Sequence, residues 1–487
     1  MNASFVRFSR QTFIGGISTS LFYLRGIFVM PLLARSFGVE GYGIWVQLIV
    51  GVELLAGIAG LGLNFALLRF VPTRDDPRHA SADLWSALLL CGFASLAMMG
   101  IGTVSGAWMS RAFFGGEAQV PVVQTALLLI PVSGSLNLVL IYFRAARAVG
   151  VYAMLVAGET AGWLLLSSAA LYLECGLEWM VIGLLAVRFL ILIVGVGTIL
   201  WHSGWWRPRI ALMAPYVRYG LPLLPLGVLN WVVNASDRYF LSYFWGPEVA
   251  GAYAVSYGIG SIVGLLYSPV FFVLLPATAA AWNVGRFEEV AEYLRFAQKY
   301  PFLLAVPVIL LLTGYAHEII GIVATSQFVA TPALIGCVAT AIAIMNVGAI
   351  AQTVLNLEYL SHRILAIGVG AAAFNVAANT VAVPRYGATG AAVTTLMTYA
   401  LQAAATYAMS RSILPFPWQW QLMAKALLAA TPLALILTLG LQASAQQPAL
   451  VIIGCASYVG LLLIFGVFEQ REWKLAKAVI GSREGSP

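Results

Sequence analysis

The sequence predicts an all-helical membrane protein that crosses the bilayer fourteen times. Three observations support this prediction: 61% of the 487 residues are hydrophobic, only 9% are charged, and fourteen apolar stretches have membrane-spanning length. A helix needs about 20 apolar residues to cross the hydrocarbon core, whereas a soluble domain carries roughly 25% charged residues. The composition therefore excludes an ordinary soluble domain.

The predicted spans follow one another through short connections. They cover residues 11–34, 44–70, 83–105, 121–143, 151–172, 179–201, 219–244, 250–276, 299–315, 332–356, 363–383, 388–410, 424–441 and 450–468. None shows the short alternating pattern of a transmembrane β-strand. An even number of spans places both termini on one side of the membrane.

The distribution of basic residues gives the orientation. Twenty of the 26 Lys and Arg residues fall on the side of the termini, and only Arg35, Arg111 and Arg385 fall in the opposite loops. Because cytoplasmic loops carry the excess of Lys and Arg, we expect both termini to be cytoplasmic. The net charge of +7 is scattered, so nucleic-acid binding is not indicated.

An internal repeat divides the spans into two groups. Gly38–Trp45 and Gly246–Tyr253 both read G-x-E-x-x-G-x-aromatic, 208 residues apart. Each lies between the first and second spans of a six-span half, so the halves have the same orientation and are related by a pseudo-twofold axis along the membrane normal. We expect an N-lobe of residues 1–211 (spans 1–6) and a C-lobe of residues 212–415 (spans 7–12). Residues 416–487 form two extra helices and a cytoplasmic tail.

Six charged residues lie well inside the predicted spans, where each costs about 2.5–3.5 kcal/mol on insertion scales. They are Arg25, Glu53, Glu159, Arg188, Asp237 and Arg238. Intramembrane charges usually face a wet cavity or a partner on another helix. Asn230 and Asn234 share a helical face with Asp237, which predicts a polar wall in the seventh span.

The pairing of these charges is predicted from their positions. Glu53 lies on the span after Arg25 and is expected to neutralise it, while Glu159 and Arg188 are expected to pair. Adjacent helical residues point about 100° apart, so Asp237 and Arg238 are expected to find partners on other helices rather than each other. Both a cavity wall and structural ion pairs remain open for all six.

Three segments carry a family likeness. They are residues 31–45 (PLLARSFGVEGYGIW), Tyr219–Pro225 with Asp237–Leu241 and Gly246–Tyr253, and Tyr386–Ala392. Together they resemble the polysaccharide flippases of the multidrug/oligosaccharidyl-lipid/polysaccharide (MOP) superfamily. The resemblance covers about residues 5–440.

This resemblance implies a flippase of O-antigen or exopolysaccharide biosynthesis in the cytoplasmic (inner) membrane. Such a protein translocates a polyprenyl-(pyro)phosphate-linked oligosaccharide by alternating access, alongside a glycan polymerase and glycosyltransferases of the same pathway. We expect Arg25, Arg238, Asn230 and Asn234 to bind the substrate, and Asp237 and Glu53 to serve in coupling or charge balance. Arg188 and Glu159 are weaker candidates for substrate contact.

Two rival functions remain. A cation or drug antiporter of the same superfamily is disfavoured by fourteen spans and three intramembrane arginines. A membrane-embedded glycan polymerase or ligase is disfavoured by short outer loops without a His/Asp/Glu constellation. No catalytic residue, cofactor or metal site is predicted, because the four cysteines form no CxxC pair and no phosphate-binding loop occurs.

Overall fold

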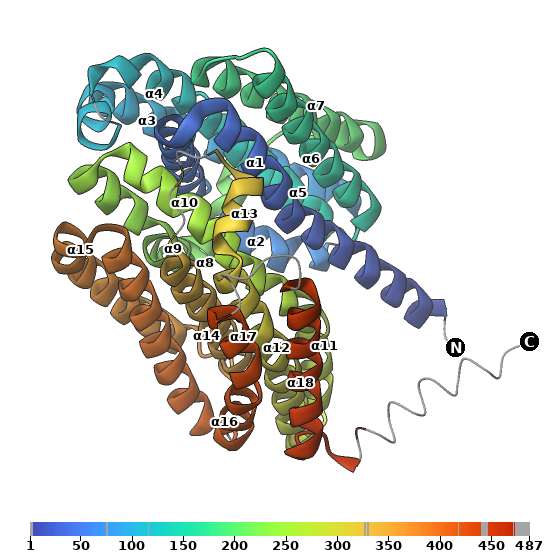
Figure 1. Ribbon diagram of the computed structural model, residues 1–487. Helices are drawn as coiled ribbons and strands as arrows, with labels where there is room; N and C mark the ends of the chain where they lie inside the picture. Colours follow the sequence, from blue (N-terminus) through green and yellow to red (C-terminus); the bar gives the residue numbers. More distant parts are fainter. Residues whose placement is uncertain are drawn as a thin grey trace, which may run out of the picture.

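The fold is built entirely of helices in the part of the chain that the structure describes (Figure 1). This computed structural model describes residues 3–74, 76–114, 116–325, 328, 331–416, 418–439, 447–470 and 472. Side chains are described from residue 25 onward, except those of residues 77, 212, 439, 447 and 448. The predicted tail beyond residue 472 lies outside this part.

The N-terminal half forms one helical group, in the upper part of Figure 1. Its α-helices are α1 (Ala3–Ala59), α2 (Leu63–Phe70), α3 (Pro77–Phe113), α4 (Val120–Leu127), α5 (Leu129–Ala145), α6 (Val149–Tyr172) and α7 (Leu177–Ser203). Two 3₁₀ turns, Val71–Thr73 and Glu117–Gln119, precede α3 and α4. The predicted span 44–70 is interrupted, because the chain turns at Leu61 and Gly62, both with positive φ.

A linker and the C-terminal half follow. The linker contains a 3₁₀ turn (Ile210–Met213), α8 (Ala214–Gly220) and a second 3₁₀ turn (Leu221–Leu223). The remaining elements are α9 (Leu224–Trp245), α10 (Pro247–Ser261), a 3₁₀ segment (Ile262–Leu266), α11 (Ser268–Asn283), α12 (Phe287–Gly314), α13 (Ala316–Val323), α14 (Pro332–Leu357), α15 (Ser361–Arg411), α16 (Trp420–Ala429), α17 (Thr431–Leu439) and α18 (Gln447–Ile464).

Ten of the described helical stretches are long and apolar enough to cross a membrane, against the fourteen spans expected. Part of the difference is continuity, since α1 and α15 run through kinks at Gly38 and Gly387 that separate two predicted spans each. Another part of the difference is composition. The polar residues of the seventh predicted span lie on α9, and α9 is not among the ten stretches that are apolar enough. The all-helical membrane fold is as predicted. The ten stretches do not determine whether the chain crosses the membrane fourteen times.

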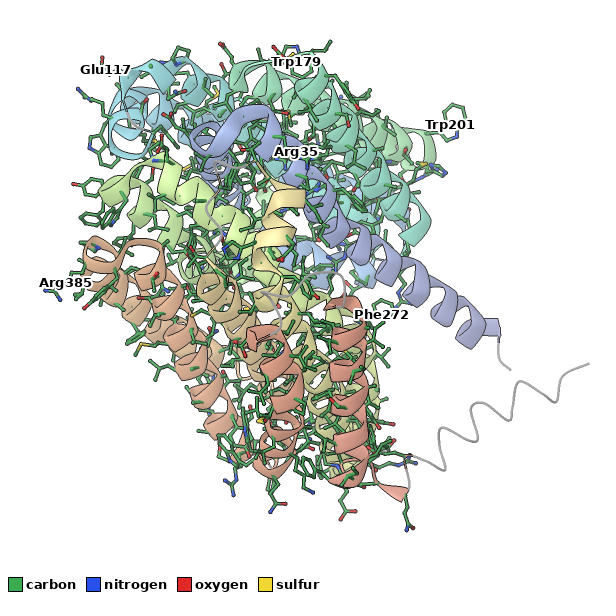
Figure 2. The ribbon with its side chains drawn as sticks, viewed as in Figure 1. Arg35, Glu117, Trp179, Trp201, Phe272 and Arg385 are labelled. Atoms are coloured by element: carbon green, nitrogen blue, oxygen red, sulfur yellow. The ribbon has the colours of Figure 1, made fainter. Side chains whose placement is uncertain are left out.

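Three labelled side chains mark opposite edges of the molecule. Glu117 and Arg385 project at one edge in Figure 2, and Trp201 projects at the opposite edge. From the sequence, we expect residues 117 and 385 on one face and residue 201 on the other. The alternation of the full set of spans stays a prediction.

The repeat found in the sequence has a structural counterpart. Gly38 has φ 67° and ψ −173°, and Gly246 has φ 87° and ψ 167°. Both glycines end a helix with a left-handed φ that residues with a Cβ rarely adopt. The chain therefore makes the same turn at both copies of the motif.

The second glycines of the two motifs bring the halves together. A Cβ on Gly43 would lie 2.0 Å from the carbonyl oxygen of Pro247, and a Cβ on Gly251 would lie 2.1 Å from that of Val39. Residues 39 and 247 are themselves 208 positions apart, so the contact is reciprocal. Only glycine allows α1 and α10 to cross this closely, and a shared apolar core surrounds the crossing.

Candidate functional site

Two cavities adjoin each other at the junction of the halves. The first, of about 520 Å³, is lined by residues of α1, α5, α6 and α7. The second, of about 470 Å³, lies between α1 and α2 on one side and α9 on the other. Both are lined by Ile49 and Glu53, so the two spaces meet at this turn of α1. We call them the N-lobe cavity and the interlobe cavity.

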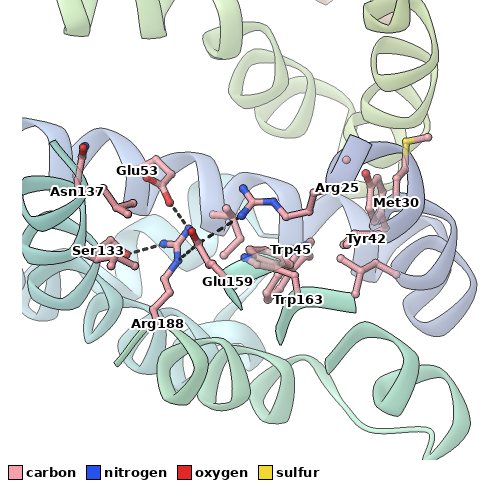
Figure 3. Close-up of a pocket in the computed structure, with 16 residues that line it drawn as sticks. Arg25, Met30, Tyr42, Trp45, Glu53, Ser133, Asn137, Glu159, Trp163 and Arg188 are labelled. Carbon is pink, nitrogen blue, oxygen red and sulfur yellow. Dashed lines mark hydrogen bonds and ion pairs between the residues drawn. The ribbon is translucent and has the colours of Figure 1, made fainter. Parts of the chain in front are cut away.

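Four charged side chains form one cluster on the wall of the N-lobe cavity (Figure 3). Arg25 lies 3.3 Å from Glu159, and Arg188 lies 2.6 Å from Glu53 and 3.4 Å from Glu159. Arg188 also donates a 2.6 Å hydrogen bond to Ser133. The predicted pair of Arg188 and Glu159 is present. Glu53 makes its close ion pair with Arg188 rather than with Arg25, although it also interacts electrostatically with Arg25 as expected.

The members of this cluster differ in exposure. The Arg188 side chain is 7% exposed, whereas that of Glu53 is 48% exposed. Arg25 also lies over the ring of Trp163, with its guanidinium carbon 5.2 Å from the ring centre. Arg188 is thus fixed in the packing, while Glu53 presents its carboxylate to both cavities.

The interlobe cavity brings together the predicted polar wall of α9. Its lining includes Asn230, Asn234 and Arg238, with Asn64 opposite. Asn234 donates to the carbonyl and side-chain oxygens of Asn230 at 2.7 and 2.9 Å. These bonds place the two amides on one helical face, as the i, i+4 spacing predicts.

Asp237 and Arg238 contact each other, contrary to the expectation from their adjacency. The Asp237 carboxylate accepts from the backbone N–H of Arg238 at 2.9 Å and lies 3.6 Å from its guanidinium. Arg238 reaches this position because it curls back to the carbonyl of Asn234 at 2.9 Å. Asp237 lines neither cavity, so its charge lies behind the wall.

Three tyrosines complete this network, and the sequence analysis did not single them out. Tyr253 donates to Asp237, the ring of Tyr257 lies 4.5 Å from the Arg238 guanidinium carbon, and Tyr399 donates to Asn234. The partners on other helices predicted for Asp237 and Arg238 therefore exist, and they include the aromatic Tyr253 and Tyr257. The sequence pattern that could have identified two of them is the i, i+4 spacing of Tyr253 and Tyr257, which places both rings on one face of α10.

Asp237 is the best candidate for a cation-binding residue. Its buried carboxylate contacts Arg238 and Tyr253 and interacts with Thr395. A buried carboxylate is stabilised by a paired or coordinated positive charge. No group of three His, Cys, Asp or Glu residues suited to a transition metal occurs in the same part of the chain.

The linker between the halves docks onto the N-terminal half. Asp83 on α3 accepts hydrogen bonds from Arg74 at 2.8 Å and from Tyr216 of α8 at 2.6 Å. Burial and the bond to Asp83 raise the pKa of Tyr216, so the phenol keeps its proton. Arg69 lies over the ring of Tyr219, 4.4 Å from its centre. This end of the junction is thus joined by polar as well as aromatic contacts.

A third, apolar cavity of about 920 Å³ lies within the C-terminal half. Its walls come from α12, α14 and α15 on one side and from α16 and α17 on the other. No charged residue is among those that line it. This cavity is therefore suited to an apolar group.

The sequence matches the family of polysaccharide biosynthesis proteins over residues 8–282. The chain belongs to this family. No curated protein matches it in a sequence comparison.

Solved structures place this polysaccharide biosynthesis protein in a known fold. The lipid II flippase MurJ, in an inward closed conformation, superposes with a TM-score of 0.72 at 14% identity, over 93% of this chain and 98% of that one. An inward-facing multidrug resistance MATE transporter gives 0.62 at 15%, over 84% and 98%. A MOP superfamily transporter from Pyrococcus furiosus gives 0.57 at 14%, over 83% and 95%. The protein therefore has the MOP transporter fold.

Proposed function

We propose that this protein is a flippase that carries a polyprenyl-(pyro)phosphate-linked oligosaccharide across the cytoplasmic membrane. The observation that supports this most strongly is a pair of adjoining charged cavities, one within the N-terminal half and one between the halves, in a member of the polysaccharide biosynthesis family. A sugar head and a phosphate cannot cross hydrocarbon unaided, and such cavities offer them hydrogen bonds throughout the crossing.

The charges on the cavity walls fit an anionic linkage. Five charged residues line the two cavities: Arg25, Arg188, Arg238, Glu53 and Glu159. Three positive and two negative charges leave one positive charge, because Asp237 lies behind the wall. A guanidinium binds phosphate through paired hydrogen bonds. We assign the phosphate to Arg238 with Asn230 and Asn234, and the sugar to the N-lobe cavity beside Arg25.

The apolar cavity offers a place for the lipid. Its 920 Å³ lie among α12, α14, α15, α16 and α17, the last two belonging to the helices predicted outside the repeat. Each buried CH₂ group contributes about 0.8 kcal/mol of transfer free energy. A polyprenyl chain would therefore gain from lying along this surface while its head occupies the polar cavities.

Alternating access and its coupling form the next part of the proposal. The two lobes, residues 1–211 and 212–415, rock about their junction while residues 416–487 move with the second lobe. Asp237, beside Thr395, binds a coupling sodium ion or proton, and Glu53 balances charge within the cavities. Because Asp237 contacts Arg238, occupation of the ion site changes the electrostatic environment of the phosphate site.

A cation antiporter is the nearest rival because MATE transporters share the fold. Its substrate would meet three arginines on the cavity walls, and like charges repel in this setting. We therefore favour the anionic lipid-linked substrate over an organic cation. A polymerase or ligase is disfavoured because neither charged cavity contains a His or Cys residue.

Reconstitution tests the proposal directly. Purified protein in proteoliposomes should translocate a fluorescent prenyl-diphosphate oligosaccharide, measured by its accessibility to an external quencher. An Arg238→Ala variant should translocate far more slowly, while Arg111→Ala, at an exposed ion pair with Glu117, should match the unmodified protein. Translocation no faster than in empty liposomes would contradict the proposal, and dye resistance on expression would favour the antiporter.

A further inference from the structure

The N-lobe cavity is balanced in charge, which limits the sugars that it accepts. Its charged lining residues are Arg25, Arg188, Glu53 and Glu159, and every one of them is within 3.4 Å of an opposite charge in the cluster. Figure 3 shows the interactions running without a break from Glu53 through Arg188 and Glu159 to Arg25. The two guanidinium groups are thus neutralised before any ligand enters.

A cluster of paired charges of this kind favours uncharged hydroxyl groups over carboxylates as ligands. A hydroxyl both donates and accepts, so it is able to bond to Glu53 or Glu159 on one side and to a guanidinium on the other. A carboxylate only accepts, and it would meet the exposed carboxylate of Glu53 at the junction of the cavities. Two like charges at close range repel strongly in a partly buried site.

An aromatic surface adjoins the charge cluster. The rings of Trp45 and Trp163 meet edge to face with centres 5.8 Å apart, and both line the cavity. Both residues are buried, and Arg25 lies over the ring of Trp163. This side of the cavity is therefore closed by apolar packing and adds no charge that would bind an acidic sugar.

We propose that the N-lobe cavity holds an electrically neutral saccharide, and that Glu53 is the residue that discriminates against acidic sugars. This inference rests on the proposed function, since it specifies the head group of the same lipid-linked substrate. The selecting group is the exposed carboxylate of Glu53 rather than the buried one of Glu159. Negative charge is thereby confined to the phosphate linkage near Arg238.

Paired ligands test this selectivity. Two short-chain prenyl-diphosphate disaccharides, identical except for a terminal glucose or glucuronic acid, are titrated into the full-length protein in nanodiscs by calorimetry. We expect the glucose compound to bind about tenfold more tightly or better. Glu53→Gln should reduce this ratio to about threefold or less by improving binding of the acidic compound. Glu53→Asp, which keeps the charge, and Glu117→Gln, at an exposed ion pair, should preserve it.

The outcomes separate this inference from the function on which it rests. Equal affinities in the unmodified protein, a preference for glucuronic acid, or an unchanged ratio in Glu53→Gln would overturn the inference and leave the flippase intact. Failure of both compounds to bind or to be translocated would contradict the proposed function and the inference together. If Glu53→Gln does not fold, the ratio of the two affinities is still measured in the unmodified protein and in Glu53→Asp. A ratio near one in either protein would overturn the inference.

Discussion

Gly43 and Gly251 pack against each other where α1 crosses α10, each facing the backbone beside the other. The contact joins equivalent positions of the two repeats, so it lies where a pseudo-twofold axis would pass. Its carbonyl partners, Val39 and Pro247, are also equivalent positions. Any motion that separates the halves on this side has to break the crossing.

Adding a single carbon at this crossing should therefore destabilise the observed arrangement. In Gly43→Ala the new Cβ would lie 2.0 Å from a carbonyl oxygen, and overpacking of this kind costs about 1–3 kcal/mol. We expect a lower melting temperature in detergent and slower translocation. Gly92→Ala on α3, where a Cβ meets nothing within 4 Å, is the matched control. Equal melting temperatures for the two variants would refute the tight crossing.

The two arginines of the N-lobe cavity should respond differently to removal. Arg188→Ala leaves Glu53 and Glu159 without their shared partner, and breaking a buried pair costs about 3–5 kcal/mol. Arg25→Ala should reduce ligand affinity and translocation with a smaller loss of stability, because Glu159 keeps Arg188. Thermal unfolding and ligand titration of both variants check this. If Arg25→Ala loses more stability than Arg188→Ala, then Arg25 rather than Arg188 has the main structural role.

Removing the charge of Asp237 should uncouple transport. In proteoliposomes with an imposed sodium or proton gradient, we expect Asp237→Asn to lose the acceleration that the gradient gives to the unmodified protein. Glu117→Gln should retain it. An Asp237→Asn variant that still responds fully to both gradients would eliminate the proposed ion site.

The docked linker makes a prediction about pH. Tyr216→Phe removes a hydrogen bond to a carboxylate, which contributes about 1.5–3 kcal/mol, and should raise hydrogen exchange in residues 210–220. Tyr219→Phe, which keeps the ring that Arg69 covers, should not. Because the pKa of Tyr216 is raised in the folded protein, its contribution is fully present below the ordinary pKa of about 10 and is lost as the pH rises above it. Protection of the linker should therefore be constant from about pH 6 to 9, and a loss within that range would contradict the assignment.

Much of the architecture could be predicted from the sequence because membrane insertion imposes simple rules. Apolar length marked the helices, and two eight-residue motifs marked the turns that α1 and α10 share, whereas the orientation inferred from basic residues stays a prediction. The number of fourteen spans stays a prediction. Gly38 and Gly387 have non-helical φ and ψ inside α1 and α15, at the points where the sequence separates two spans, and the turn at Gly62 separates α2 from α1.

The sequence identified residues that share polar networks in the structure, but it identified their pairing only in part, as for Arg188 with Glu159. All eight predicted residues fall in the two polar networks that the structure describes. The choice between Arg25 and Arg188 as the partner of Glu53 depends on helix rotation, which spacing along one helix does not report. Adjacent side chains such as Asp237 and Arg238 meet because both bend toward their own backbone, a short-range effect that ideal helical geometry omits.

The attachment of α8 to Asp83 bears on how the protein is assembled. The segment that follows Gly204, which has a positive φ, includes α8. Because Tyr216 of α8 donates a hydrogen bond to Asp83, this segment binds the N-terminal half through its own contacts. Continuity of the chain at Gly204 is then dispensable for alignment. Two separately translated fragments, divided there, should find each other in the membrane through Tyr216 and the Gly43–Gly251 crossing and rebuild one transporter.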